Sequence, residues 1–268
     1  KLMEESRKAV ASLDHARVGI APHSLRAVTP DELAEIVPLA KDGPIHIHAA
    51  EQMKEVEDCI AWSKQRPVEW LLDHAGANAQ WCLVHATHMT AEETARLAKS
   101  GAVAGLCPVT EANLGDGLFP APDFRASGGR FGIGSDSNVL IGAAEELRTL
   151  EYGQRLALRG RNILASGEGT STGRSLFDGA LCGGVQALGA PPAELKEGRP
   201  ADLVSLDATH PAFAGRSGDA ILDSWIFGGA PAVDCVWRAG TRLVAGGRHK
   251  NRQQITQRYK EVLVTIVN

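Results

Sequence analysis

Five short apolar segments, separated by helical patterns, constrain the fold of this chain more than any other feature of its sequence. They occupy residues 17–23, 44–50, 81–86, 102–108 and 130–136. Each is largely continuous rather than alternating, which is typical of parallel strands that are covered on both faces. Thr29 and Thr90 each open an intervening helix with a capping box, and Gly101 closes the second of these helices. The pattern predicts an α/β fold built from repeated β-α units.

The rest of the chain shows other patterns. Residues 143–162 and 173–189 predict helices, whereas residues 196–210 and 231–248 alternate, contain glycine turns and predict short antiparallel strands. A final amphipathic helix is expected near the C-terminus. We therefore expect a β-α region over residues 1–195, a small β region over 196–248 and a C-terminal helix over 249–268.

Two architectures are compatible with the first region. Five parallel strands could form an open, doubly wound sheet. They could equally be the second half of an eight-stranded barrel, because a whole barrel needs about 250 residues and this region is shorter.

Charge and hydropathy exclude two classes of partner. The net charge is −4 and no basic tract is present, which argues against nucleic acid as a partner. No apolar run approaches the length of about 20 residues that spans a membrane, and the N-terminal residues lack the apolar core of a signal peptide. The five cysteines include no C-x₂-C pair and predict buried thiols in a reducing, cytoplasmic compartment: Cys59, Cys82, Cys107, Cys182 and Cys235.

Polar side chains that could carry chemistry lie at or just beyond the ends of all five apolar segments: His23, His48, His85, Glu111 and Asp136. Ligands bind at the carboxyl ends of parallel strands, so a functional site is expected there. Glu51 follows His48 in an H-x-x-E pattern that can bring a metal-binding imidazole and a proton-carrying carboxylate together. Taken singly, such a histidine is usually a hydrogen-bonded core residue, and Asp136 could be a helix N-cap. His46 lies on the same strand face as His48.

In these motifs the chain resembles the amidohydrolase superfamily. H-x-x-E, then His85, then the Ser-Asp pair ending at Asp136 match the fifth, sixth and eighth strands of the family barrel. PADLVSLD and VWRAGTRLVAGGR are similar to its small β-sandwich. The resemblance implies that residues 1–195 are the C-terminal portion of a (β/α)8 barrel, strands 4–8, and that residues 196–248 are part of the sandwich.

The resemblance also implies roles for the site residues. His48 would be a zinc ligand, Glu51 an acid-base group, His85 the catalytic imidazole, and Asp136 both a zinc ligand and a base. One zinc ion per chain is implied, with two further histidine ligands from a first-strand His-x-His that is absent from this sequence. The chain is therefore expected to be the C-terminal portion of a longer enzyme.

More narrowly, APHSLRAV, HIHAAEQ, LVHATH, CPVTEANLGDG and GIGSDSNV look like the formimidoylglutamate deiminases of histidine degradation. That family uses one zinc ion to hydrolyse N-formimino-L-glutamate to N-formyl-L-glutamate and ammonia, and the resemblance implies a homodimer. His23 and Arg26 would bind the substrate, and a guanidinium fork suits its carboxylates. Two alternatives stay open: a deaminase of guanine, cytosine or triazine rings, and an inactive, metal-free fragment. Arg26 favours an anionic substrate over a neutral ring.

Overall fold

A computed structural model describes residues 1–13, 16–137, 140–229 and 232–267. The chain divides into two compact units, Lys1–Pro192 and Ala193–Asn268, and each is described by itself. Asn138, Val139 and Pro231 belong to predicted motifs or strands but lie outside the described residues.

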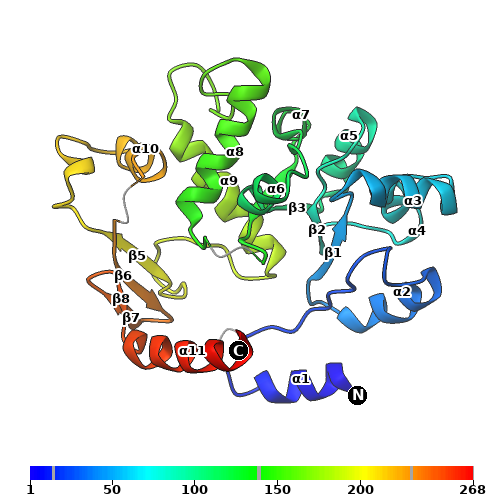
Figure 1. Cartoon of the computed structure of the whole chain (residues 1–268), viewed down its shortest axis with the longest axis horizontal. Coiled ribbons are helices and arrows are strands. Elements are labelled where there is room, and N and C mark those ends of the chain that lie inside the picture. Colours follow the sequence, from blue (N-terminus) through cyan, green and yellow to red (C-terminus); the bar gives the residue numbers. More distant parts are fainter. Residues whose placement is uncertain (14–15, 138–139, 230–231, 268) are drawn as a thin grey trace. The chain divides into compact units, whose positions relative to one another are not determined.

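The first unit contains a parallel four-stranded sheet (Figure 1). Its strands are β1 (Ile45–Ala49), β2 (Trp81–His85), β3 (Val103–Leu106) and β4 (Arg130–Ile133), in spatial order β1-β2-β3-β4. Four of the five predicted strands are thereby confirmed, as is the α/β class. The register places Ala49 of β1 beside His85 of β2, so these two strands end level with each other. Within the described residues the strands form an open row, so the predicted barrel is not observed as a closed sheet.

The first predicted strand, residues 17–23, is wrong as a full strand. This segment pairs with β1 through two isolated parallel bridges, Ile20 with Ile45 and Ser24 with His48. The backbone N–H of His46 donates to Ile20, but the N–H of His48 donates to His23, one residue beyond the regular position. Pro22 lies between these contacts, and because proline has no N–H it cannot donate to the ladder. The segment still places His23 and Ser24 beside the end of β1.

Helices connect the strands of the first unit. Their bounds are α1 (Leu2–Val10), α2 (Pro30–Ile36), the 3-10 turn η1 (Val37–Ala40), α3 (Met53–Ser63), α4 (Pro67–His74), α5 (Ala91–Ser100), α6 (Pro108–Leu114), α7 (Ala121–Ala126), α8 (Ala143–Leu158) and α9 (Thr172–Ala187). Both predicted capping boxes are present, at Thr29 and Thr90, and Gly101 ends α5 with a φ of 80°.

Helix α9 lies directly against the sheet because glycine permits a close approach. A Cβ atom on Gly183 would come within 1.9 Å of the carbonyl oxygen of Phe131 in β4. Glycine normally weakens a helix interior by about 1 kcal/mol, so its presence here reflects backbone packing rather than helix propensity. Cys182, one position earlier, is exposed and contradicts the predicted burial of all five thiols, whereas the other four cysteines are buried.

The second unit contains an antiparallel sheet, as the alternating patterns predicted. Its strands are β5 (Leu203–Leu206), β6 (Val233–Arg238), β7 (Thr241–Ala245) and β8 (Arg248–His249), paired in that order. The 3-10 turn η2 (Pro211–Phe213) and α10 (Ala220–Phe227) precede β6, and α11 (Arg252–Val267) ends the described chain.

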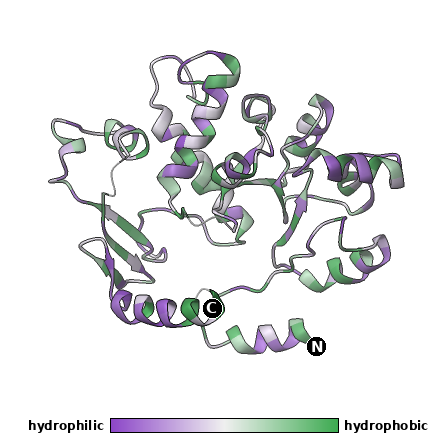
Figure 2. Cartoon of the chain, in the orientation of Figure 1, coloured by the Kyte–Doolittle hydropathy of each residue, from purple (hydrophilic) through white to green (hydrophobic). Residues whose placement is uncertain are grey.

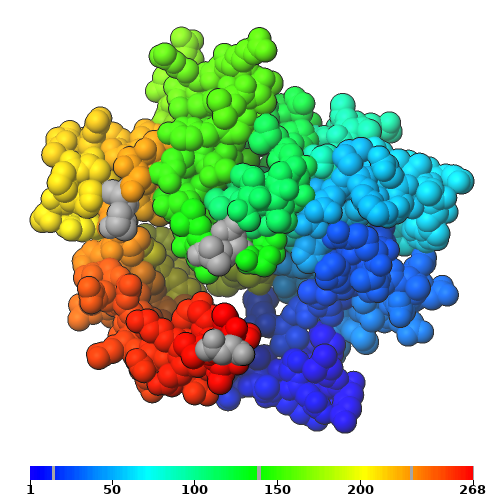
Figure 3. All heavy atoms as spheres, in the orientation of Figure 1, coloured from blue at the N-terminus to red at the C-terminus, as the bar shows by residue number. Residues whose placement is uncertain are grey.

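The predicted C-terminal helix is confirmed as α11, which buries none of its residues. Its side chains lie at the surface in Figure 3, and Figure 2 shows its last part in hydrophobic green. None of the described helices is long and apolar enough to cross a membrane.

Candidate functional site

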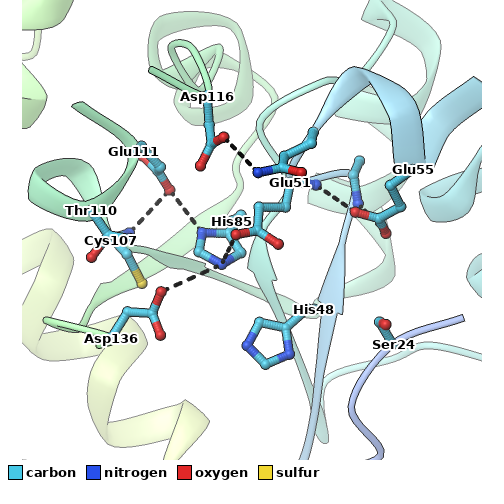
Figure 4. A network of polar contacts seen from close by, with 12 residues as sticks. Ser24, His48, Glu51, Glu55, His85, Cys107, Thr110, Glu111, Asp116 and Asp136 are labelled. Atoms are coloured by element: carbon cyan, nitrogen blue, oxygen red, sulfur yellow. Dashed lines mark hydrogen bonds and ion pairs between the residues drawn. The ribbon is translucent and has the colours of Figure 1, made fainter. Parts of the chain in front are cut away.

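The polar residues singled out in the sequence gather at the carboxyl edge of the parallel sheet (Figure 4). His48 lies near the end of β1 and His85 ends β2, while Asp136 follows β4. Glu51 follows β1, and His23 and Arg26 come from the segment beside it. A chain of contacts joins all six residues: His23 to His48, His48 to His85, Arg26 to Glu51, Glu51 to His85, and His85 to Asp136. The predicted proximity of these residues is confirmed, while their chemical roles stay predictions.

At this edge the backbone of four residues has a positive φ angle, a conformation that residues other than glycine rarely adopt. Ala50 has a φ of 52°, His85 of 69°, Ala86 of 49° and Asp136 of 50°. Such residues cost free energy and persist where surrounding contacts fix them. Glu55 of α3, which is buried, provides such contacts by accepting the N–H groups of Ala50 at 3.0 Å and Glu51 at 2.9 Å. The site is therefore held by its surroundings and not by the local preferences of its own residues.

His48 is oriented by the neighbouring segment. Its Nδ1 lies 2.7 Å from the carbonyl oxygen of His23, which can only accept, so Nδ1 carries the hydrogen. In the neutral ring this leaves the lone pair on Nε2, the arrangement typical of a metal-binding histidine. His46, by contrast, bonds through Nε2 to the carbonyl oxygen of Ala187 at 2.8 Å, which ties β1 to α9.

His85 is fully enclosed, with 0% of its surface exposed. Its Nδ1 lies 3.3 Å from Glu111 Oε1, and its Nε2 lies 3.7 Å from Glu51 Oε1 and 3.9 Å from Asp136 Oδ2. Burial acts to lower the pKa of His85, but the hydrogen bond to Glu111 and the charges of Glu51, Glu111 and Asp136 outweigh it and raise that pKa. Among the described residues, Nε2 has no hydrogen-bond partner.

Glu51 is paired with Arg26. The guanidinium Nη2 donates to Glu51 Oε2 at 2.8 Å, while Arg26 Nε donates to Ser24 Oγ at 3.3 Å. Burial acts to raise the pKa of Glu51, but the hydrogen bond from Arg26 and the nearby positive charges of His85, Arg26 and His48 lower it overall. Glu51 is therefore a carboxylate near neutral pH, ready to accept a proton. His23 Nδ1 lies 2.9 Å from the same Ser24 hydroxyl, so one serine positions both predicted substrate-binding residues.

Three supporting carboxylates are given no specific role by the sequence-based interpretation, although Glu111 is among its candidate residues. Glu55 braces the end of β1, and Glu111 faces His85. Glu146 of α8 is buried and accepts the N–H of Val109 at 2.9 Å, which anchors the first turn of α6. Burial, with the charges of Glu111, Glu145 and Asp136, raises the pKa of Glu146 to about 7 despite the hydrogen bond from Val109. Glu111 stands at a strand end in the sequence, but no sequence signal identifies the other two.

The residues of this chain fit part of a zinc site. His48 offers an Nε2 lone pair and Asp136 a carboxylate, and both donor types suit zinc. Catalytic zinc ordinarily takes three protein ligands, yet the described residues contain no group of three or more His, Cys, Asp and Glu side chains that could hold a metal ion. His48 and Asp136 can therefore be two members of a ligand set but do not complete it.

Comparisons with known proteins agree on one family. The model of the amidohydrolase family matches residues 1–243. A formimidoylglutamate deiminase from Pseudomonas aeruginosa is 50% identical over 265 residues, which cover 98% of this chain and 58% of the relative. The crystal structure of an amidohydrolase from Brucella melitensis is 57% identical with a TM-score of 0.96, covering 100% of this chain and 59% of that one.

A more distant match shares the fold. It is an adenosine deaminase from Xanthomonas campestris, determined with bound zinc, with 23% identity, a TM-score of 0.81, and coverage of 97% of this chain and 61% of that one. The present chain thus spans less than two thirds of the length of each of these three proteins.

Proposed function

Since this chain belongs to the amidohydrolase family, we propose that it forms part of a hydrolase that converts N-formimino-L-glutamate and water into N-formyl-L-glutamate and ammonia. The observation that carries the proposal is the convergence of His48, Glu51, His85 and Asp136 at one edge of a parallel sheet, with Arg26 beside them. The 50% identity to a formimidoylglutamate deiminase supports this substrate over others.

We further propose that one zinc ion is held by His48 and Asp136, with two histidines from outside this sequence. When bound, zinc lowers the pKa of a coordinated water from 15.7 to about 7 and so supplies a nucleophile at neutral pH. The parallel sheet would then be strands 4–8 of a (β/α)8 barrel, with Ile20 and its neighbours in the place of the first of these. The second unit would be part of the family's β-sandwich.

The proposed chemistry assigns one proton step to each carboxylate of the site. Asp136 accepts one proton from the nucleophilic water as its oxygen attacks the C=N carbon of the formimino group. Glu51, an anion because Arg26 and the neighbouring imidazoles lower its pKa, accepts the remaining proton of that oxygen as the C=O bond forms. Both protons pass to the formimino nitrogen, so the C–N bond breaks and this nitrogen leaves as ammonia. His85 directs Nε2 between these two carboxylates and orients the nucleophilic water there.

Substrate binding follows from Arg26. In the present structure its guanidinium pairs with Glu51, and we propose that a substrate carboxylate binds the same planar group, with His23 beside it. We propose that this contact with Arg26 directs the formimino group of the substrate towards His85 and Asp136. Resemblance to the deiminases also supports a cytoplasmic homodimer that acts in histidine degradation.

Ammonia release tests the proposal. The purified full-length protein, loaded with zinc, is assayed with N-formimino-L-glutamate and with guanine, cytosine and adenosine. We expect turnover of N-formimino-L-glutamate only. Turnover of a ring substrate with none of formiminoglutamate would replace the proposal with a ring deaminase, and a protein that binds no zinc and releases no ammonia would support the metal-free alternative.

A pair of variants tests the role of Arg26 in the same assay. Arg26→Met removes a charged hydrogen-bond donor, so the KM for formiminoglutamate should rise roughly 10- to 100-fold. Arg96→Met is the matched control, because Arg96 is equally exposed and also pairs with a carboxylate, that of Asp73. An equal change of KM in both variants would remove Arg26 from the binding site.

A further inference from the structure

Glu111 lies behind the catalytic imidazole and has no part in the proposed proton steps. We propose that Glu111 is a positioning residue, which holds His85 in one tautomer and one orientation so that the lone pair of Nε2 faces the reacting atoms. The inference rests on the proposed function for the identity of those atoms. The placement of the ring itself depends only on the contacts of this chain.

The two side chains meet where water has no access. Glu111 is 4% exposed and His85 is fully buried. Glu111 Oε1 lies 3.3 Å from His85 Nδ1 and 3.2 Å from the backbone nitrogen of Cys107. The N–H of Cys107 can only donate, so this carboxylate oxygen acts as an acceptor, and His85 Nδ1–H completes the pair. Nδ1 therefore carries the hydrogen.

Contacts of the first turn of α6 in turn fix the position of Glu111. Thr110 donates its hydroxyl to the carbonyl oxygen of Ser135, just before Asp136, and Val109 donates its N–H to the buried Glu146. Cys107, at the N-cap, is held by Glu111 itself. Because α6 is tied both to α8 and to the segment after β4, the carboxylate that faces His85 has little freedom to move.

The other ring nitrogen shows why the tautomer matters. With Nδ1 protonated, the neutral ring presents a lone pair at Nε2, between Glu51 Oε1 and Asp136 Oδ2. Three acceptors then face one another, and Nε2 has no hydrogen-bond partner among the described residues. Such a group of acceptors stabilises a hydrogen-bond donor placed between them, such as a reacting water or an N–H of the amidine. The opposite tautomer would fill this place with its own hydrogen.

Nitrogen NMR of the histidine rings tests the tautomer directly. The full-length protein is labelled with ¹⁵N-histidine, and the signals of His85 are identified by their loss in His85→Asn. At a pH where the ring is neutral we expect Nδ1 protonated and Nε2 unprotonated, with zinc and after its removal by a chelator. A neutral ring with the hydrogen on Nε2 in both samples would overturn the proposal.

Two variants of Glu111 separate positioning from packing. Glu111→Ala removes the acceptor, so the ring should populate both tautomers and kcat should fall roughly 10- to 100-fold with little change in KM. In Glu111→Gln the amide oxygen can take the place of Oε1, because Cys107 N–H selects an acceptor there. This variant should restore the wild-type tautomer and most of kcat.

Glu151→Gln is the matched control. Glu151 is also buried and accepts two backbone N–H groups, those of Ile163 and Leu164, and its ion pair is with Arg155. We expect this variant to keep the His85 tautomer and kcat, whatever it does to stability. A Glu111→Ala protein with an unchanged tautomer, or with a kcat no lower than that of Glu151→Gln, would reduce Glu111 to a packing residue.

The design keeps two failures apart. If Glu111→Ala does not fold, the NMR spectra of the wild type and of Glu111→Gln test the proposal in its place. A change of the His85 tautomer in Glu111→Gln with an unchanged kcat would contradict it. If the protein does not turn over formiminoglutamate, the tautomer is still measured and the positioning of His85 stands or falls on it. If it turns over formiminoglutamate but His85 carries its hydrogen on Nε2, only the role of Glu111 is lost.

Discussion

The two sheets of this chain bury different kinds of side chain. In the described part of the chain, every buried polar or charged residue lies in the unit Lys1–Pro192. The buried residues of the second unit are Phe213, Ile226, Ala232 and Cys235, none of which carries a charge. Among the described residues, the parallel sheet of the first unit is thus surrounded by buried carboxylates, whereas the antiparallel sheet of the second unit is not.

The buried carboxylates share one kind of contact. Each of the five accepts at least one backbone N–H group: Glu55, Glu93, Glu111, Glu146 and Glu151. Burying a carboxylate is costly unless hydrogen bonds compensate it. Buried charge in the first unit therefore occurs where loops and helix starts need fixed N–H groups, and three of the five carboxylates brace the candidate site. In the described part of the second unit no carboxylate is buried.

The largest expected effect tests whether the chemistry belongs to the first unit alone. Asp136→Asn removes a proposed zinc ligand and base, so turnover of formiminoglutamate should fall at least roughly 10³-fold. Asp202→Asn is the matched change in the second unit, where the carboxylate pairs with Arg238, and it should leave turnover unchanged. Ammonia release and zinc content are measured for both. Normal turnover by Asp136→Asn would end its assignment.

The next effect compares an ion pair in each unit. Arg66 donates to Glu93 at 2.6 Å, and the side chain of Glu93 is only 4% exposed. Arg66→Ala leaves that buried charge without its ionic partner, so we expect a loss of about 3–5 kcal/mol in the free energy of unfolding of the first unit. Arg238→Ala breaks an exposed pair with Asp202 and should cost at most about 1 kcal/mol.

Hydrogen exchange followed by mass spectrometry measures this comparison, because it reports the opening of each unit separately. Exchange in α4 and α5 should accelerate strongly in Arg66→Ala, while β5 and β6 should change little in Arg238→Ala. Salt should weaken only the exposed pair. Equal losses in the two units would mean that burial of the ion pair does not set its importance.

The sequence predicts the strands better than the contacts among them. Continuous apolar runs identified β1 to β4, which are buried or half-buried along most of their length. The segment containing Ile20 has the same continuous apolar pattern but does not form a full strand, because Pro22 lacks the N–H group that would donate to a neighbouring strand. Cys182 was expected to be buried like the other cysteines, yet it is exposed, and the neighbouring Gly183 takes the place against the sheet.

The same limit applies to the site. His48, His85 and Asp136 could be identified because strand ends in a parallel sheet share one edge, which is a consequence of topology. The partners of these residues come from helices, and their contacts depend on how those helices pack. Glu55 and Glu146 read as ordinary helix residues in sequence, and nothing in the pattern predicts that they are buried.

The last prediction concerns Glu146, a buried carboxyl group whose pKa is raised. The pKa of Glu146 is raised from 4.5 to about 7, so the folded state binds this proton more tightly than the unfolded state. Its contribution to stability is full below about pH 4.5 and is lost as the pH rises through about 7, which amounts to up to about 3 kcal/mol. Glu146→Gln cannot titrate, so in metal-free protein its stability should fall less than that of the wild type between pH 5 and pH 8. Glu261→Gln, on the exposed helix α11, should follow the wild type, and urea unfolding at both pH values measures all three. Identical pH dependence in Glu146→Gln and the wild type would show that Glu146 is ionised in both the folded and the unfolded state. The first unit would then bury this carboxylate as a charge, at a lower cost in free energy than its contrast with the second unit implies.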